Sequence, residues 1–295
     1  MNGQWSYNSN NTGVQASTCT ASGSYSTAMG DGTTASGDYS TSMGRSTAAS
    51  ALYSTAMGRS TAASALYSTA MGYGTDASGY FSTAMGSSTT ASALYSTAMG
   101  DGTIASGSRS TAMGSYTTAS DYASLSIGRY NSVNSTVTAG GSAASFDTDN
   151  AAFVIGNGTG SSTKSDAFVV YFNGNATLSG DLTINSDARL KDNIQPLGST
   201  LNKLHQIEGK TYSFKKDEEH TPKIGVLAQE VQAVFPELVT EGGDGILSVN
   251  YQGLVPVLIN AINEQDAKMS EQEVKMSEQD AKIAALEEMV RFLAV

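Results

Sequence analysis

Ser186 and Lys191 lie five positions apart and are the residues whose types and spacing could do chemistry. A serine hydroxyl is a weak nucleophile until a base takes its proton, and a lysine amine can be that base when its surroundings lower its pKa. If Ser186 stands at or just before the first turn of a helix, where serine is favoured as a cap, the chain can fold Lys191 back toward the hydroxyl. On spacing alone, a capping serine and a solvated lysine are the commoner explanation.

The residues around this pair form a longer pattern. The run is Ser186-Asp187-Ala188-Arg189-Leu190-Lys191, and three further blocks follow in order at residues 224–232, 234–239 and 249–251, the last continuing through Leu254 and Leu258. Together they resemble the self-cleaving intramolecular chaperone domain of phage tail spikes and endosialidase-type tailspikes. The resemblance covers residues 186–295 and implies a domain that promotes trimerisation of the part before it and then cuts itself off at the peptide bond preceding its own serine.

Under this resemblance, Ser186 is the nucleophile, Lys191 is the general base, and the bond between Asn185 and Ser186 is cleaved. The hydroxyl attacks the neighbouring carbonyl, an ester forms, and water resolves it. Such a serine peptidase acts once on its own chain, so no multiple-turnover activity is expected. Asp187 and Arg189 match the same signature and are expected to have structural roles. Asp187 would be an acid at the start of the helix, and Arg189 would form an ion pair.

No cofactor or metal site is expected. The single cysteine, Cys19, excludes an internal disulfide and a thiolate zinc site. His205 and His220 have no recognisable ligand spacing, and His220 follows a charged run, so both are interpreted as surface residues. The nine carboxylates of residues 1–185 are scattered over variable positions, which disfavours the acid–base pair of a tailspike glycosidase.

Charge is distributed unevenly along the 295 residues, whose formal net charge is -11. Residues 1–185 carry 5 basic and 9 acidic side chains, whereas residues 186–295 carry 11 and 18, so two kinds of polymer meet near residue 185. The acidic balance argues against nucleic acid or anionic lipid as a partner. No secretory signal and no membrane-spanning run of 18 apolar residues is found, which predicts release by another route, such as lysis, or a fragment.

A pentapeptide of the type Ser-Thr-Ala-Met-Gly recurs every 14 residues through the first part of the chain. It ends, with small variations, on Gly30, Gly44, Gly58, Gly72, Gly86, Gly100, Gly114 and Gly128. Each unit reads as two short extended segments separated by small residues that permit tight turns. Because a unit this short buries no core alone, successive units are predicted to stack as coils of a β-solenoid, and the thin core predicts an oligomer.

The repeat resembles the left-handed parallel β-roll of trimeric autotransporter adhesin heads, through runs such as Tyr53-Ser54-Thr55-Ala56-Met57-Gly58 followed by a small-residue return strand. Stacking would align identical positions into rows along the axis. One row is expected inside the solenoid and consists of Met29, Met43, Met57, Met71, Met85, Met99, Met113 and Ile127. An aromatic row stops at Arg109 and consists of Tyr25, Tyr39, Tyr53, Tyr67, Phe81 and Tyr95. Both rows are interpreted as core or interface packing, with carbohydrate stacking as the alternative for the aromatic row.

A third row offers a rival function. It consists of Thr33, Thr47, Thr61, Thr75, Thr89, Thr103 and Thr117. A flat ladder of threonine hydroxyls could order water on an ice-binding face. One threonine per coil is weak support, because serine and threonine are common in any exposed parallel sheet.

A heptad pattern begins at Leu258. One core position holds Ile262, Met269, Met276, Ile283 and Val290, and the other holds Leu258, Gln265, Gln272, Gln279, Leu286 and Leu293. This pattern predicts a coiled coil, and its glutamine layers help to set register and oligomer state. The resemblance to the chaperone domain implies a trimer.

The expected fold is therefore mainly β in the N-terminal part and α/β in a C-terminal chaperone domain that ends in a trimeric coiled coil. The expected domains are an N-terminal segment with disorder as one alternative (1–16), a β-roll (17–130), a β neck (131–185), the chaperone and autoprotease (186–257) and the coiled coil (258–295). The function expected is that of a homotrimeric tail-fibre-like adhesion protein of a virion, with a host cell-surface receptor or glycan as the candidate partner. The alternatives are a bacterial surface or secreted adhesin head and an ice-binding solenoid.

Overall fold

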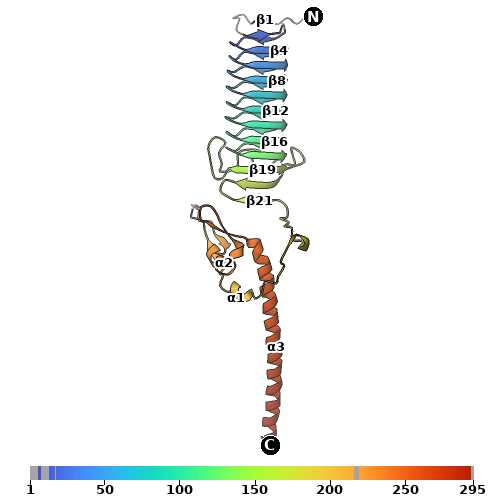
Figure 1. Cartoon of the computed structure of the whole chain (residues 1–295), viewed down its shortest axis with the longest axis vertical. Helices are drawn as coiled ribbons and strands as arrows, with labels where there is room; N and C mark the ends of the chain where they lie inside the picture. The colour runs from blue at the N-terminus through green and yellow to red at the C-terminus, as the bar shows by residue number, and fades with distance from the viewer. Residues whose placement is uncertain (1–5, 8–12, 17, 216–218, 294–295) are drawn as a thin grey trace. The chain divides into compact units, whose positions relative to one another are not determined.

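The computed structural model describes residues 6–7, 13–16, 18–215 and 219–293 and divides into two compact units, 1–184 and 185–295. The first unit is a β-solenoid whose flat coils stack along one axis (Figure 1). Its larger sheet has 13 strands in the order β1-β2-β4-β6-β8-β10-β12-β14-β16-β18-β19-β20-β21, and its smaller sheet has eight in the order β17-β15-β13-β11-β9-β7-β5-β3. The predicted β-solenoid is confirmed.

The strands of the larger sheet that come from the repeats are five residues long. They are β4 (Thr27–Asp31), β6 (Thr41–Arg45), β8 (Thr55–Arg59), β10 (Thr69–Tyr73), β12 (Thr83–Ser87), β14 (Thr97–Asp101), β16 (Thr111–Ser115) and β18 (Leu125–Arg129). The short strands of the second sheet are β3 (Thr20–Ala21), β5 (Thr34–Ala35), β7 (Ala48–Ala49), β9 (Ala62–Ala63), β11 (Asp76–Ala77), β13 (Thr90–Ala91), β15 (Ile104–Ala105) and β17 (Thr118–Ala119). Repeat positions pair in parallel without a shift, as Met71 does with Met57 and Met85.

Alanine, not methionine, fills the interior, which corrects the expected placement of the methionine row. In each long strand the side chains alternate, so Ala70 points inward and is fully buried while Thr69 and Met71 on either side are half-buried on the outer face. Two alanine rows, one from each sheet, form the core. Two rows of small hydroxyl residues are buried beside them, so the interior is too narrow for a methionine side chain.

The threonine row of the ice-binding alternative is buried as well. Its members, from Thr33 to Thr117, are at most 1% exposed. A hydroxyl that faces the interior cannot order water on a surface, so this row provides no ice-binding face. Several of these hydroxyls, including that of Thr75, have no hydrogen-bond partner, whereas Thr47 is 2.7 Å from the hydroxyl of Ser42, which replaces an alanine of the core row.

The aromatic row lies on a turn at the edge of the coils. Tyr67 has a φ of +57°, a conformation that is costly for a bulky residue, and the other members share it. Neighbouring rings stack with centroids 4.9 to 5.1 Å apart, and the guanidinium of Arg109 continues the row 5.6 Å from the Tyr95 ring. Stacking covers the flat faces of the inner rings, which leaves only ring edges to solvent and disfavours the carbohydrate-stacking alternative.

The last coil is closed by asparagine side chains from the loop after β18. Asn131 accepts a hydrogen bond from the Thr118 N–H and donates one to the Thr118 carbonyl, so it pairs with the open edge of β17. Asn134 accepts from the N–H groups of Ser120 and Asp121. These amides replace the next coil, so the edge strand is not left unpaired.

The larger sheet continues beyond the repeats. β19 (Ala151–Asn157) pairs in parallel with β18, which places Ile155 beside Ile127, and β20 (Asp166–Tyr171) and β21 (Ala176–Leu178) follow antiparallel. At the other end, β1 (Ser6–Tyr7) pairs with β2 (Val14–Gln15), and β2 pairs with β4. Most of the expected N-terminal segment, 1–5 and 8–12, lies outside the described residues.

The second unit combines short strands with helices. Its strands form two antiparallel pairs, β22 (Lys210–Tyr212) with β23 (Lys223–Gly225) and β24 (Val239–Glu241) with β25 (Leu247–Val249). Its helices are α1 (Leu201–Leu204), α2 (Ala228–Val234) and α3 (Leu254–Leu293), and its 3-10 turns are η1 (Ala188–Leu190), η2 (Pro236–Leu238) and η3 (Tyr251–Gly253). Val231, Phe235 and Val257 are buried together in its core. No helix in the described residues is long and apolar enough to span a membrane.

Candidate functional site

The segment around Ser186 and Lys191 is a tight turn on an exposed stretch of chain. Asp187 is the N-cap of η1, because its Oδ1 accepts a hydrogen bond from the Arg189 N–H at 2.9 Å. The Lys191 N–H donates to the Ala188 carbonyl and closes the turn. Ser186 therefore lies just before the first turn, as the sequence predicts, but the element is a single 3-10 turn with aspartate as its cap.

This turn brings the two sequence-predicted residues together. The Lys191 Nζ lies 2.7 Å from the Ser186 Oγ and donates a hydrogen bond to it. That distance suits proton transfer between a hydroxyl and an amine once the lysine is neutral. Asn185, which contributes the carbonyl of the expected cleavage site, directly precedes Ser186 in the same exposed segment.

Asp187 and Arg189 stabilise the turn from outside. The Arg189 Nη2 is 2.6 Å from the Asp187 Oδ2, and the Nε is 3.1 Å from both carboxylate oxygens. The side chain and N–H of Arg189 hold the pKa of the Asp187 carboxyl below its usual value, and Asp187 raises the pKa of the Arg189 guanidinium. Both groups therefore stay charged when the pH falls moderately, and the turn keeps its cap.

A second cluster fastens the chain after this turn to α3. Glu264 accepts hydrogen bonds from the Thr200 N–H at 2.6 Å and from the Ser199 hydroxyl at 2.9 Å. Asn260, one helical turn earlier, donates to the Gly198 carbonyl at 2.6 Å and to Glu264 at 2.9 Å. This cluster was not predicted from the sequence. The one sequence feature that could have indicated it is the polar pair Asn260 and Glu264, which are four positions apart on the helix and away from the predicted core positions of the heptad.

The later blocks of the sequence pattern build the core that supports α3. The Tyr251 hydroxyl accepts a hydrogen bond from the Val226 N–H. This hydroxyl is close to Gly225, where an added Cβ would lie 2.6 Å from the hydroxyl oxygen. Phe235, the residue after α2, is 2% exposed in the same core, with the Lys203 Nζ 5.2 Å from the centre of its ring. These contacts explain the residue types of the blocks as packing rather than as chemistry.

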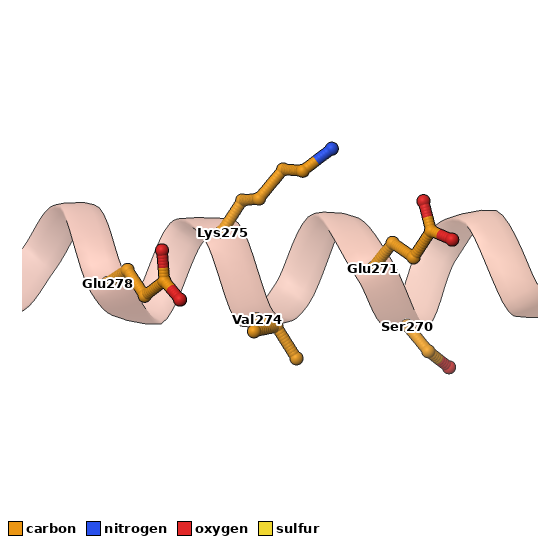
Figure 2. A pocket seen from close by; sticks show the side chains of 5 residues that line it. All are labelled: Ser270, Glu271, Val274, Lys275 and Glu278. Carbon is orange, nitrogen blue, oxygen red and sulfur yellow. The ribbon is translucent and has the colours of Figure 1, made fainter.

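Other candidate sites are weak. A hollow on α3 is lined by Ser270, Glu271, Val274, Lys275 and Glu278, all from one helix (Figure 2). Figure 2 shows Lys275 and Val274 pointing to opposite sides of the helix, so these residues line open helix surface and do not enclose a pocket. Within the part of the chain that the structure describes, no group of three or more His, Cys, Asp or Glu residues could hold a metal ion.

Comparisons with known proteins agree with both resemblances. Residues 186–240 match the family model described as chaperone of endosialidase. The YadA head domain repeat matches at 21–47, 49–75, 77–103 and 105–131. The two matches lie on the two compact units of the fold, and both resemblances are confirmed.

Phage tail fibres are among the similar proteins. The long tail fiber protein Gp37 of Escherichia phage AR1 is 39% identical over 97 residues, which cover 30% of this chain and 9% of that protein. The Gp37 proteins of Salmonella phage S16 and Enterobacteria phage K3 are 34% and 32% identical over 99 and 93 residues, which cover 30% and 29% of this chain and 13% and 8% of those proteins. The matches thus span about a tenth of the length of these relatives.

Proposed function

We propose that this chain is a homotrimeric, tail-fibre-like structural and adhesion protein of a virion. Its C-terminal unit drives trimerisation and then cleaves the bond between Asn185 and Ser186. The 2.7 Å contact between the Lys191 Nζ and the Ser186 Oγ carries this proposal, because it lies inside the segment that matches the chaperone of endosialidase. The resemblance to tail fibres of three phages supports the virion as location.

The chemistry proposed is an acyl transfer within one chain. Neutral Lys191 takes the proton of the Ser186 hydroxyl, and the Oγ attacks the carbonyl carbon of Asn185. The C–N bond breaks, the Ser186 nitrogen receives the proton from Lys191, and an ester joins Asn185 to the Ser186 Oγ. Water hydrolyses the ester, which leaves a carboxylate on Asn185 and restores the hydroxyl of Ser186. Each chain reacts once, because its substrate is its own backbone.

Assembly would prepare the base. In a single chain the segment with Lys191 is exposed to water, whereas general-base catalysis needs a neutral amine in a suited environment. Coverage by neighbouring copies would disfavour the charged form and free the amine to take a proton. We therefore expect cleavage to follow trimerisation rather than precede it.

The outer face of the larger sheet supports self-association. The methionine row continues through Ile127 and Ile155, and Phe168 pairs beside Ile155 on β20. In a single chain these side chains are only half-buried, and Met113 is 39% exposed. A long apolar row on one face of a thin solenoid is typical of an interface between copies.

The charges of α3 support a parallel arrangement of the copies. Ile262 is an a position of the heptad and Gln265 is a d position. The g positions that flank this core hold Lys268, Lys275 and Lys282, and the e positions hold Asp266, Glu273, Asp280 and Glu287. In a parallel coiled coil a g residue meets the e residue five positions later in the neighbouring chain, so each lysine would meet an acid. An antiparallel pairing would instead bring lysines together. Apolar core positions such as Ile262, 58% exposed in the single chain, await such a partner.

Intact mass under denaturing conditions tests the cleavage. We expect the wild-type chain to yield fragments of 185 and 110 residues, while Ser186→Ala and Lys191→Ala stay whole. Lys215→Ala, which changes an exposed lysine elsewhere in the same unit, is the matched control and should be cleaved like the wild type. A wild-type chain that stays whole as a folded trimer would leave Ser186 as a turn residue only and overturn the proposal.

An adhesin head is the second candidate function, favoured by the match to the YadA head domain repeat. Mass spectrometry of purified virions and of bacterial surface fractions separates the two. Detection in virions supports the tail-fibre proposal, and detection only at the cell surface or in the medium supports the adhesin head.

A further inference from the structure

The segment that follows the Ser186–Lys191 turn is fastened to α3 at one dense cluster. Thr200 is 1% exposed, and its hydroxyl lies 3.3 Å from the Val257 carbonyl, 3.2 Å from Glu264 and 3.0 Å from the Asn260 Nδ2. Between Lys191 and Ser199 the side chains are exposed and no helix or strand forms. The cluster is thus where the chain downstream of the turn becomes fixed to the helix.

The Glu264 carboxylate is the centre of this cluster. It accepts from two hydroxyls, two backbone N–H groups and the Asn260 amide, and none of these donors is a cation. An acceptor surrounded by donors depends on its negative charge. A glutamine there would turn an NH2 group toward donors of its own kind, so it could not replace the carboxylate.

The cluster leaves the coiled-coil seam free. With Ile262 and Gln265 as core positions, Asn260 and Glu264 fall at the f and c positions, away from the seam. The same stretch of α3 can therefore pack against other copies on one side and hold residues 198–201 on the other. Lys191 and Gly198 are seven positions apart in the chain, a reach of at most about 25 Å.

We propose that Glu264, together with Asn260, is a positioning latch that couples the formation of α3 to the placement of the cleavage turn. The inference rests on the proposed function, in which neighbouring copies cover the Ser186–Lys191 turn after assembly. The latch would limit how far this turn can move from α3, so that the neighbouring copies can cover it. Glu264 acts through residues 198–201 and does not itself touch the reacting atoms.

The test compares Glu264→Gln with Glu271→Gln, the same substitution at the same heptad position one repeat later, where the side chain is exposed. Cleavage is followed by intact mass during cell-free synthesis of the full chain. Amide hydrogen exchange is measured on both variants combined with Ser186→Ala, which keeps the chains whole. We expect Glu264→Gln to slow cleavage about 10- to 100-fold and to speed exchange at residues 198–204, with α3 melting as in Glu271→Gln.

Each outcome decides the inference. Cleavage at the wild-type rate in a Glu264→Gln chain whose residues 198–204 exchange faster would reduce the cluster to a local fold contact and overturn the coupling. Equal exchange in the two variants would show that Glu264 fastens nothing. A wild-type chain that is never cleaved overturns the proposed function instead, and exchange then decides whether the latch exists.

Discussion

Gly72 lies so close to Gly86 in the next coil that a Cβ on Gly72 would stand 1.9 Å from the Gly86 carbonyl oxygen. Gly72 also has a φ of +123°, which only glycine adopts readily. We therefore expect Gly72→Ala to lower the free energy of unfolding by about 3 kcal/mol or more, because backbone must shift in both coils. Thermal and denaturant unfolding followed by circular dichroism measures the loss.

Gly74 provides the control in the same coil. Its φ is +61° and a Cβ would meet no atom closer than 3.8 Å, and other coils carry serine at this position with the same backbone. Gly74→Ala should cost only about 1 kcal/mol. Equal losses for the two variants would contradict the close approach of the coils at Gly72.

The buried pair of Ser42 and Thr47 suggests a stabilising change elsewhere. In the coil of Ala70 and Thr75, the Thr75 hydroxyl is buried without a partner, and Ala70→Ser would place a hydroxyl where Ser42 stands two coils earlier. We expect Ala70→Ser to raise the free energy of unfolding by up to about 1 kcal/mol. In a Thr75→Val background the same change should lose its benefit, and a double-mutant cycle measures the difference.

Removal of one ring from the aromatic row should destabilise the solenoid. Tyr67 stacks on Tyr53 and Phe81 with centroids 4.9 Å away on both sides. We expect Tyr67→Ala to lower the free energy of unfolding by about 1–3 kcal/mol through the loss of two ring contacts. Tyr80→Ala, at a 59% exposed neighbouring position, should change it by less than about 0.5 kcal/mol. Similar effects at both positions would refute a stabilising role for stacking.

The charge pattern of α3 predicts a rescue. Lys275→Glu should weaken self-association, because at every contact between two copies it places a glutamate opposite Asp280 of the neighbouring copy. Adding Asp280→Lys restores opposite charges between copies, so the double variant should recover most of the lost assembly. Sedimentation and concentration-dependent melting follow the effect, which should shrink at high salt. A double variant no better than the single one would contradict the parallel register.

Acid should release the latch at Glu264. Its pKa is held below the ordinary glutamate value, chiefly by the N–H of Thr200 and further by the Ser199 hydroxyl and the Leu201 N–H. The stabilisation is therefore complete above the ordinary value of about 4.3 and is lost as pH falls through the lowered pKa. The C-terminal unit of Glu264→Gln should therefore melt at a lower temperature than that of the wild type. This difference should stay constant from pH 7 to about 5 and disappear in stronger acid. A difference that disappears near neutral pH would contradict the assignment.

The sequence predicted the periodic parts of the molecule better than their interior. The 14-residue spacing was enough to predict parallel coils with identical positions in register, as Met71 and Met85 show. It failed on which row lies inside, because hydrophobicity favoured methionine while the narrow space between the two sheets accepts only side chains of the size of Ala70. The volume available to a side chain therefore determines which row lies inside. That volume depends on the distance between the two sheets, which cannot be read from the sequence of one repeat.

The candidate site divides in the same way. The short spacing of Ser186 and Lys191 let the sequence predict their proximity, because only one turn separates them. Ser199 and Thr200, which donate hydrogen bonds to Glu264, lie more than 60 positions earlier in the chain, so only the folded unit brings them to it. The catalytic roles of Ser186 and Lys191 stay predictions until the cleavage is measured.

The fixed pairing of coil on coil makes the 14-residue unit interchangeable. Removal of residues 58–71 would join Met57 to Gly72 and leave every remaining strand with a neighbour of the same kind. A deletion whose length is not a multiple of 14 would break this pairing of identical positions. The asparagine-closed end would stay intact. Genes of this type can therefore gain or lose whole coils by recombination between near-identical stretches, and the solenoid can change length without a change of architecture.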